Sequence, residues 1–231
     1  MFETLGEALT LLLHMDPQVV AIVWLSFKVG MSAVTLATLI GLPLGAIVAV
    51  AQFPGRNAAT ILLNGMLGLP SVVVGVFVYL VLSRSGPLGS FGLLFSPPAM
   101  IIAQTILVVP LIAAFTRQII EDAWREYRIE FRALRFSLAN QIGALLYDCR
   151  FSLVVAVLAG MGRSMSEVGA VMIVGGNIEG YTRSMTTAIA LETAKGDLPL
   201  SIALGLVLIS VIMLLNTAAY TLRSWAMRRY G

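Results

Sequence analysis

RQIIEDAWREYRIEFRALRFSLANQIGALLYDCR, residues 117–150, is the one long polar passage in an otherwise apolar sequence. It holds six arginines and five carboxylates, and apolar runs of helix length lie before and after it. A charge at the centre of a membrane helix costs roughly 2.5–3.5 kcal/mol, so a segment with this many charges does not stay in the bilayer. We therefore expect it to leave the membrane on one side and to act as a docking element for a partner.

The composition is that of an integral membrane protein. Of the 231 residues, 58% are hydrophobic and 12% are charged, whereas soluble domains have about 25% charged residues. The formal net charge of +3 is too small to indicate nucleic-acid binding. The one cysteine, Cys149, cannot form an internal disulfide, and no cysteine and histidine cluster indicates a metal site. Residues 1–16 lack lysine and arginine, so we expect no cleaved signal peptide.

Apolar runs predict an all-α membrane protein that forms a single domain, residues 1–231. A crossing helix needs about 20 mostly apolar residues. Residues 2–14 are too few and carry glutamates among their leucines, which predicts a helix at the membrane surface. Residues 185–194 predict a helix too short to cross. Five spans are predicted, at residues 29–51, 57–83, 99–119, 151–176 and 199–222, with a coupling segment at about 120–148.

Two prolines interrupt the first two predicted spans. Pro43 lies in the run GLPLG, residues 41–45, and is expected to bend its helix. Pro70 ends the run LGLP, residues 67–70, where a second break is expected. Broken helices expose backbone carbonyls, which the membrane interior tolerates against protein or beside a water-lined path. Both prolines are therefore candidate walls of a pathway, and a packing kink without function is the alternative.

The distribution of positive charge predicts the orientation. With five spans and the amino end outside, ten arginines fall on the inner side, namely Arg56, the six of residues 117–150 and three in the tail. Three positive residues fall outside: Arg84, Arg183 and Lys195. This asymmetry follows the positive-inside rule and places the polar segment and the carboxyl end in the cytoplasm. A sixth span at residues 185–195 would reverse the tail.

Arg163 and Glu167 lie in the middle of the fourth predicted span, with Ser164 and Ser166 beside them. Charges at this depth face a bundle interior or a water-filled path and pair with one another, and residues four apart share a helix face. One interpretation is a pathway-side pair, in which Arg163 offsets the repulsion of an anion by Glu167. The other is an ion pair that only holds helices together. We expect no catalytic residues.

The polar loop after this span is a second candidate. Residues 175–182 contain Asn177, Gly180 and Thr182. We predict either an outer gate or a contact for an extracytoplasmic partner, with a plain connecting loop as the alternative.

Four motifs closely resemble the permease subunits of molybdate and tungstate ABC importers. They are LPSVVVG (69–75), LSRSGPLG (82–89), GRSMSEVGA (162–170) and VGGNIEGYTR (174–183). The form EVGAVMIVGGNI (167–178), followed by MTTAIA (185–190), is most similar to the tungstate branch, whereas molybdate relatives tend to have Gly-Glu-Phe-Gly-Ala. The resemblance extends from Trp24 to Leu222.

The resemblance implies a type I ABC importer permease fold in the plasma or inner membrane of a prokaryote. It further implies a homodimer of this chain, a cytoplasmic ATPase dimer that holds ATP and Mg, and an extracytoplasmic oxyanion-binding protein. The sequence agrees, because it contains no Gly-x-x-x-x-Gly-Lys-Ser/Thr loop and its lysines are Lys28 and Lys195 alone. We expect no cofactor in the chain itself.

The resemblance also assigns the polar segment to ATPase coupling. In these permeases a Glu-Ala-Ala loop precedes a glycine, and here Glu130, Ala133 and Leu134 fit while the glycine falls on Arg135 or Phe136. The resemblance implies cytoplasmic coupling helices, and we predict that residues 128–138 form the helix that docks into the ATPase, with an apolar stripe of Phe131, Leu134 and Leu138.

Other functions remain open from the residues alone. Molybdate or sulfate is the alternative substrate. A self-contained secondary transporter would show inverted repeats with paired broken helices, but the second half has no counterpart to the two proline breaks. A membrane-embedded enzyme would need a convergent nucleophile or metal set, which the sequence does not offer.

Overall fold

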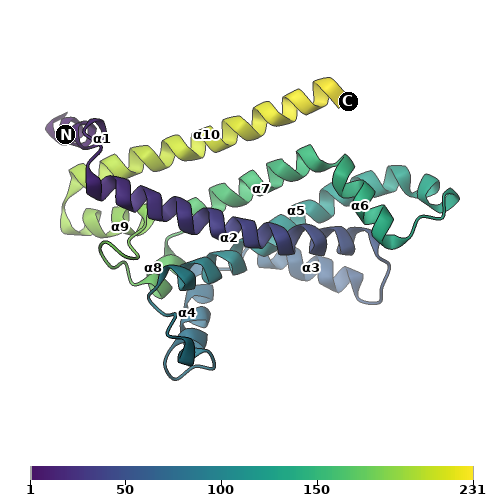
Figure 1. Ribbon diagram of the computed structural model, residues 1–231, viewed down its shortest axis with the longest axis horizontal. Helices are drawn as coiled ribbons and strands as arrows, with labels where there is room; N and C mark the ends of the chain where they lie inside the picture. The colour runs from purple at the N-terminus through teal and green to yellow at the C-terminus, as the bar shows by residue number, and fades with distance from the viewer. Residues whose placement is uncertain (1, 231) are drawn as a thin grey trace.

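The computed structural model describes residues 2–230 (Figure 1). Over this range the protein is helical with no strand, as the apolar runs predict. The elements are α1 (Phe2–Leu13), α2 (Pro17–Val50), α3 (Arg56–Met66), α4 (Ser71–Leu82), a short 3-10 turn (Gly89–Phe91), α5 (Pro97–Ala133), α6 (Leu138–Asp148), α7 (Arg150–Met165), α8 (Gly169–Gly175), α9 (Met185–Lys195) and α10 (Leu198–Tyr230).

Five membrane crossings are consistent with these helices. Three helices are each long and apolar enough to span a bilayer: α2, α5 and α10. The bent pairs α3–α4 and α6–α7 pass the same test when each pair is taken as one span. The prediction of an all-α, five-span permease fold with a short amino-terminal helix is confirmed at this level.

Helix α2 begins twelve residues before the predicted span of residues 29–51 and contains almost all of it. Asp16 caps the amino end by accepting hydrogen bonds from the backbone N–H groups of Gln18 and Val19. Pro17 occupies the first turn, where a backbone N–H would have no partner within the helix. The helix then runs through Lys28 and Pro43 to Val50 as one element. Lys28 is exposed, so its long stem can carry the ammonium to the interface without ending the helix.

A stripe of small residues joins α2 to α5. Its members recur every fourth residue and all are buried: Ala33, Ala37, Gly41, Gly45 and Ala49. A Cβ on Gly41 would lie 3.0 Å from Ile112, and one on Gly45 would lie 2.7 Å from Thr116. Small side chains at this spacing let two membrane helices approach closely. The two helices run in parallel, since position 41 meets 112 and position 45 meets 116.

The predicted break before Pro70 is confirmed and is sharper than a kink. Helices α3 and α4 meet at an angle of 101°, so the segment 57–83 is two helices. Figure 1 shows α4 turning away from the long helices, while α3 lies along them. Pro70 is the residue before α4 and has an extended backbone. Gly75 and Gly169 allow α4 to pack against α8, because Cβ atoms there would crowd Ala170 and Val72.

The docking helix predicted over residues 128–138 is wrong as an element. Helix α5 continues to Ala133, a turn follows with Arg135 at φ 51°, and α6 begins at Leu138. The extension of α5 is held by ion pairs of Glu121 with Arg117 and Arg125 at helical spacing. Charged side chains disfavour a position inside the membrane, but they do not end a helix. Arg135 has a left-handed backbone conformation, which favours glycine. It is one of the two positions at which the family motif has its glycine.

The fourth predicted span, 151–176, is also interrupted. Helix α7 ends at Met165, residues 166–168 are not helical, and α8 starts at Gly169. The side chain of Thr186 donates to the backbone carbonyl of Glu167 over 2.7 Å, so α9 supplies a partner that the helix ladder would otherwise provide. A long-range hydrogen bond therefore stabilises the break.

Candidate functional site

The break between α7 and α8 is surrounded by polar side chains from several helices. A small cavity of about 10 Å³ lies there, enough for about one water molecule. Its polar lining comes from α2, α5, α7, the break and the start of α9: Ser26, Gln104, Ser164, Glu167, Ser184 and Thr186. Val29, Met100 and Met165 complete the wall. A buried polar cluster of this kind is unusual in a membrane core and points to function.

Gln104 and Ser164 connect α5 to α7 through a reciprocal pair of hydrogen bonds. The Ser164 hydroxyl donates to the Gln104 side-chain oxygen over 2.9 Å, and the Gln104 amide nitrogen donates to the Ser164 backbone carbonyl over 3.2 Å. Both residues are buried. The pair therefore fixes the end of α7 against α5, directly beside Glu167.

Arg163 and Glu167 do come together, but they occupy different environments. The nearest guanidinium nitrogen lies 3.6 Å from a carboxylate oxygen, which is an ion pair rather than a short hydrogen bond. The Glu167 side chain is 6% exposed and that of Arg163 is 40% exposed. Glu167 also lies beyond the helix end. The carboxylate thus belongs to the buried cluster, while the guanidinium extends to the surface.

The two neighbouring serines also lie in different environments. Ser164 is buried in the cluster, whereas Ser166 is exposed and donates to the backbone carbonyl of Arg163 over 3.1 Å. Pro43 and Pro70 are both exposed and do not line the cavity. The structure therefore joins Ser164 and Glu167 in one site, with Arg163 and Ser166 on its outer side, and leaves the two prolines elsewhere.

The loop after α8 is a tightly folded turn. Thr182 is fully buried; its hydroxyl donates to the Gly175 carbonyl and accepts from the Ile178 N–H. Asn177, at φ 50°, donates to the Thr187 carbonyl from α9. Gly180 is exposed with φ 69°. Thr182 thus holds the loop together and is closed to a partner, and Gly180 lies on the accessible surface.

An ionic cluster next to this loop, built on the buried residues Arg183 and Glu192, was not predicted. Arg183 is 8% exposed and lies 3.4 Å from the buried carboxylate of Glu192 and 3.6 Å from Glu179. Lys195 lies 3.1 Å from the same Glu192 oxygen. Together they join the loop to α9. The sequence places Glu192 and Lys195 three apart, which indicates a local pair, but gives no sign that Arg183 reaches them.

The opposite end of the molecule, where α5 turns into α6, carries the residues predicted for coupling. Glu130, Ala133, Arg135 and Leu138 are exposed, and Leu134 is 65% exposed. Phe131 is 9% exposed and stacks between Trp124 and Phe136. The predicted stripe is therefore divided, because Phe131 packs inside the protein. Ile129, Leu134 and Leu138 are exposed apolar residues in the stretch of sequence around this turn.

Proteins of similar sequence identify the family. Tungstate uptake system permease protein TupB of Peptoclostridium acidaminophilum is 39% identical over 96% of this chain and 97% of its own length. TupB of Campylobacter jejuni is 36% identical over 96% of this chain and 93% of its own length. A probable anion ABC transporter permease protein of Haloferax volcanii is 38% identical over 92% of this chain and 94% of its own length. The chain is an ABC importer permease of the tungstate and molybdate family. The predicted similarity to the tungstate branch is confirmed.

More distant relatives and solved structures agree with this permease assignment. The sulfate permease CysW of Escherichia coli is 27% identical over 76% of this chain, and the molybdenum permease ModB of Mycobacterium bovis is 26% identical over 85%. The inward-facing MetNI methionine ABC transporter superposes with a TM-score of 0.75 at 16% identity, covering 91% of this chain and 97% of that one. It shares the fold. No family model matches the sequence. The permease is a multi-pass membrane subunit of a transporter.

Proposed function

We propose that this permease forms, as a homodimer, the path by which an ATP-driven importer carries tungstate across the membrane. The observation that carries the proposal is the polar cluster at the α7–α8 break with Arg163 on its outer side. The relatives with 36–39% identity that are named as tungstate permeases support the substrate.

The small size of the cavity supports the homodimer in this proposal. A space of about 10 Å³ accommodates a water molecule and no tetrahedral oxyanion. We infer that the path runs along the surface of one protomer and is closed by a second protomer. Arg163 and Ser166 lie on the exposed side of the break, so they can face such a path while Glu167 stays behind them. We also keep Pro43 and Pro70 as exposed candidates for its walls.

The ends of the molecule suit two further partners. The apolar surface at the α5–α6 turn, Ile129, Leu134 and Leu138, is flanked by Glu130 and Arg135. Exposed apolar groups with a charged rim are typical of a protein interface, and we assign this end to the cytoplasmic ATPase dimer with its ATP and Mg. The opposite end has a pocket of about 400 Å³ between the start of α2 and residues 179–183. We assign that end to the extracytoplasmic binding protein.

The test is uptake by cells or vesicles that contain the permease with its ATPase and binding protein. Tungstate uptake should require ATP, and it should stop when the ATPase is replaced by a hydrolysis-deficient variant while the permease is unchanged. Excess sulfate should compete weakly. Uptake by the permease alone, driven by an ion gradient, would instead identify a secondary transporter.

Molybdate and sulfate are the alternative substrates, supported by the more distant ModB and CysW relatives. Competition distinguishes them: the anion that inhibits tungstate uptake at the lowest concentration, or is itself taken up fastest, is the physiological substrate. Equal transport of all three by the complete complex would place selection outside the permease.

A further inference from the structure

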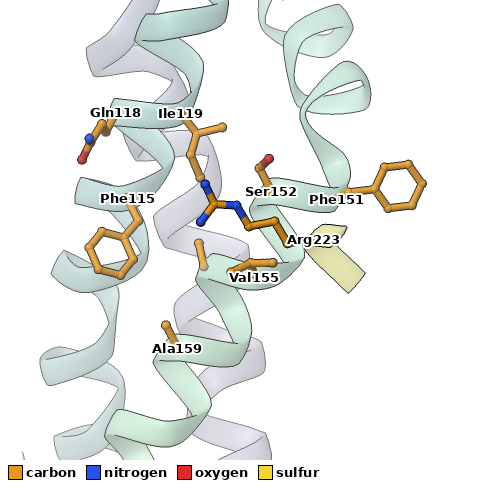
Figure 2. Close-up of a pocket in the computed structure, with 9 residues that line it drawn as sticks. Phe115, Gln118, Ile119, Phe151, Ser152, Val155, Ala159 and Arg223 are labelled. Atoms are coloured by element: carbon orange, nitrogen blue, oxygen red, sulfur yellow. The ribbon is translucent and has the colours of Figure 1, made fainter. Parts of the chain in front are cut away.

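A cleft of about 450 Å³ opens between α5, α7 and α10, away from the α7–α8 break. Its wall is mostly apolar, with Phe115 and Ile119 from α5 and Val155, Ala156 and Ala159 from α7. Gln118, Ser152 and Arg223 are its polar members. Figure 2 shows the Arg223 side chain extending from α10 toward the residues of α5 and α7. The cleft therefore has an apolar body and a cationic mouth.

Arg223 is available for an anionic ligand. It is exposed, and among the residues whose side chains the structure describes no carboxylate forms an ion pair with it. Arg117, which lies on α5 next to Gln118, is already paired with Glu121. An arginine without an internal counter-ion at the edge of an apolar groove leaves a positive potential there.

The mouth of the cleft also has the features of a membrane interface. Phe151 and Trp225 form an edge-to-face pair with ring centroids 5.4 Å apart. Arg150 lies 4.6 Å from the Phe151 ring, and Arg229 lies 5.5 Å from the Trp225 ring. Aromatic rings and arginines gather at the level of lipid headgroups. The apolar body of the cleft extends from this level along the spanning part of α7.

We propose that this cleft binds an anionic phospholipid, with its phosphate at Arg223 and Ser152 and one acyl chain against Phe115, Val155 and Ala159. Basic pockets between membrane helices are known to hold such headgroups. The charge of the mouth selects an anionic lipid over a zwitterionic one, and the apolar wall selects a lipid over a free oxyanion. Helix α10 is mostly uncovered along its apolar length, which gives lipid access.

Native mass spectrometry of the full-length permease complex, released from mild detergent with added lipid, tests the proposal. Wild type should retain phosphatidylglycerol in preference to phosphatidylcholine by about fivefold, equivalent to ~1 kcal/mol per basic residue at the surface. Arg223→Gln should abolish this preference. Arg228→Gln, on the same helix but outside the cleft lining, is the matched control and should keep it.

A second pair of variants tests the apolar body. Ala159→Phe fills the cleft and should lower retention of both lipids, whereas Val154→Phe changes an exposed residue of the same helix outside the lining and should not. Excess sodium tungstate should not displace the lipid. Displacement would identify an oxyanion site, and dissociation of the dimer by Ala159→Phe would identify a second protomer as the occupant; either result overturns the proposal.

Quenching of the Trp225 fluorescence in vesicles measures the position of the lipid. In a full-length variant with Trp24→Phe and Trp124→Phe, brominated phosphatidylglycerol should quench Trp225 more strongly than brominated phosphatidylcholine, and Arg223→Gln should equalise the two. Equal quenching before the substitution would contradict the proposal. Because the mass measurement uses the natural tryptophans, a folding defect in this variant leaves that test intact.

Discussion

At the scale of single residues, Arg163 and Glu167 show that paired charges need not share an environment. The carboxylate lies in the polar cluster beside Gln104 and Ser164, and the guanidinium is half exposed. Loss of the arginine leaves a buried carboxylate without a counter-ion, while loss of the carboxylate leaves an arginine that water can still solvate. The two single substitutions therefore differ in how much stability they remove. If the pair only held one helix face together, the two substitutions would remove equal stability.

We predict that Arg163→Met destabilises the assembled complex more than Glu167→Gln does, by ~1–2 kcal/mol after allowance for the exposed guanidinium. The double variant should recover thermal stability, because no unpaired charge remains. If this face borders the path, tungstate uptake should stay low in the double variant, since the potential felt by the anion has changed. The measurements are thermal unfolding and uptake in parallel.

Arg228→Met, which removes an exposed arginine near the end of α10 and outside the cluster, is the control and should change neither stability nor uptake. Recovery of stability and uptake together in the double variant would make the pair a packing device.

At the scale of elements, the close approach of α2 and α5 depends on residues without side chains. We predict that Gly45→Ala destabilises the permease by ~1–3 kcal/mol, because the added Cβ meets Thr116 and the backbone of α5. Gly65→Ala is the matched control, since it lies in α3 with no atom within 4 Å of the added Cβ. It should leave stability unchanged or raise it by up to ~1 kcal/mol. Thermal unfolding in detergent compares them, and equal effects would contradict the packing account.

The α5–α6 turn gives a second prediction for an element. Leu134→Asp places a charge in the exposed apolar surface and should release the ATPase without unfolding the permease, because Leu134 makes little contact within the chain. Co-purification of the two subunits and uptake are the measurements. Phe131→Asp provides the contrast, since Phe131 is buried and should unfold the turn itself. Wild-type co-purification of Leu134→Asp would place the docking surface elsewhere.

At the scale of the whole molecule, the coupling turn and the loop at residues 176–184 lie toward opposite ends of the long helices (Figure 1). We predict that reporters fused after Gly231 and within the α5–α6 turn are cytoplasmic, whereas one fused near Gly89 is outside, as the distribution of arginines requires. Reporter activity and accessibility to an impermeant reagent measure this. A carboxyl end outside the membrane would contradict the five-span topology.

The sequence by itself determined the class of protein and the family. Hydropathy and charge are properties of short segments, so they predicted α10, the break at Pro70 and the exit of residues 117–150 from the membrane without knowledge of any long-range contact. The motifs around Glu167 and Asn177 identified the permease family for the same reason, because they are contiguous.

The tertiary structure alone decided where helices end and which residues share a site. At the break of residues 166–168, the Glu167 carbonyl accepts a hydrogen bond from Thr186, nineteen positions later. Gln104 reaches Ser164 across sixty positions, and Phe131 is buried in a hydrophobic cluster with Val50 of α2, Leu145 of α6 and Leu153 of α7. Such contacts depend on how helices pack, and a hydropathy pattern contains no information about the partner of a polar side chain. The cleft at Arg223 likewise exists only where three helices meet.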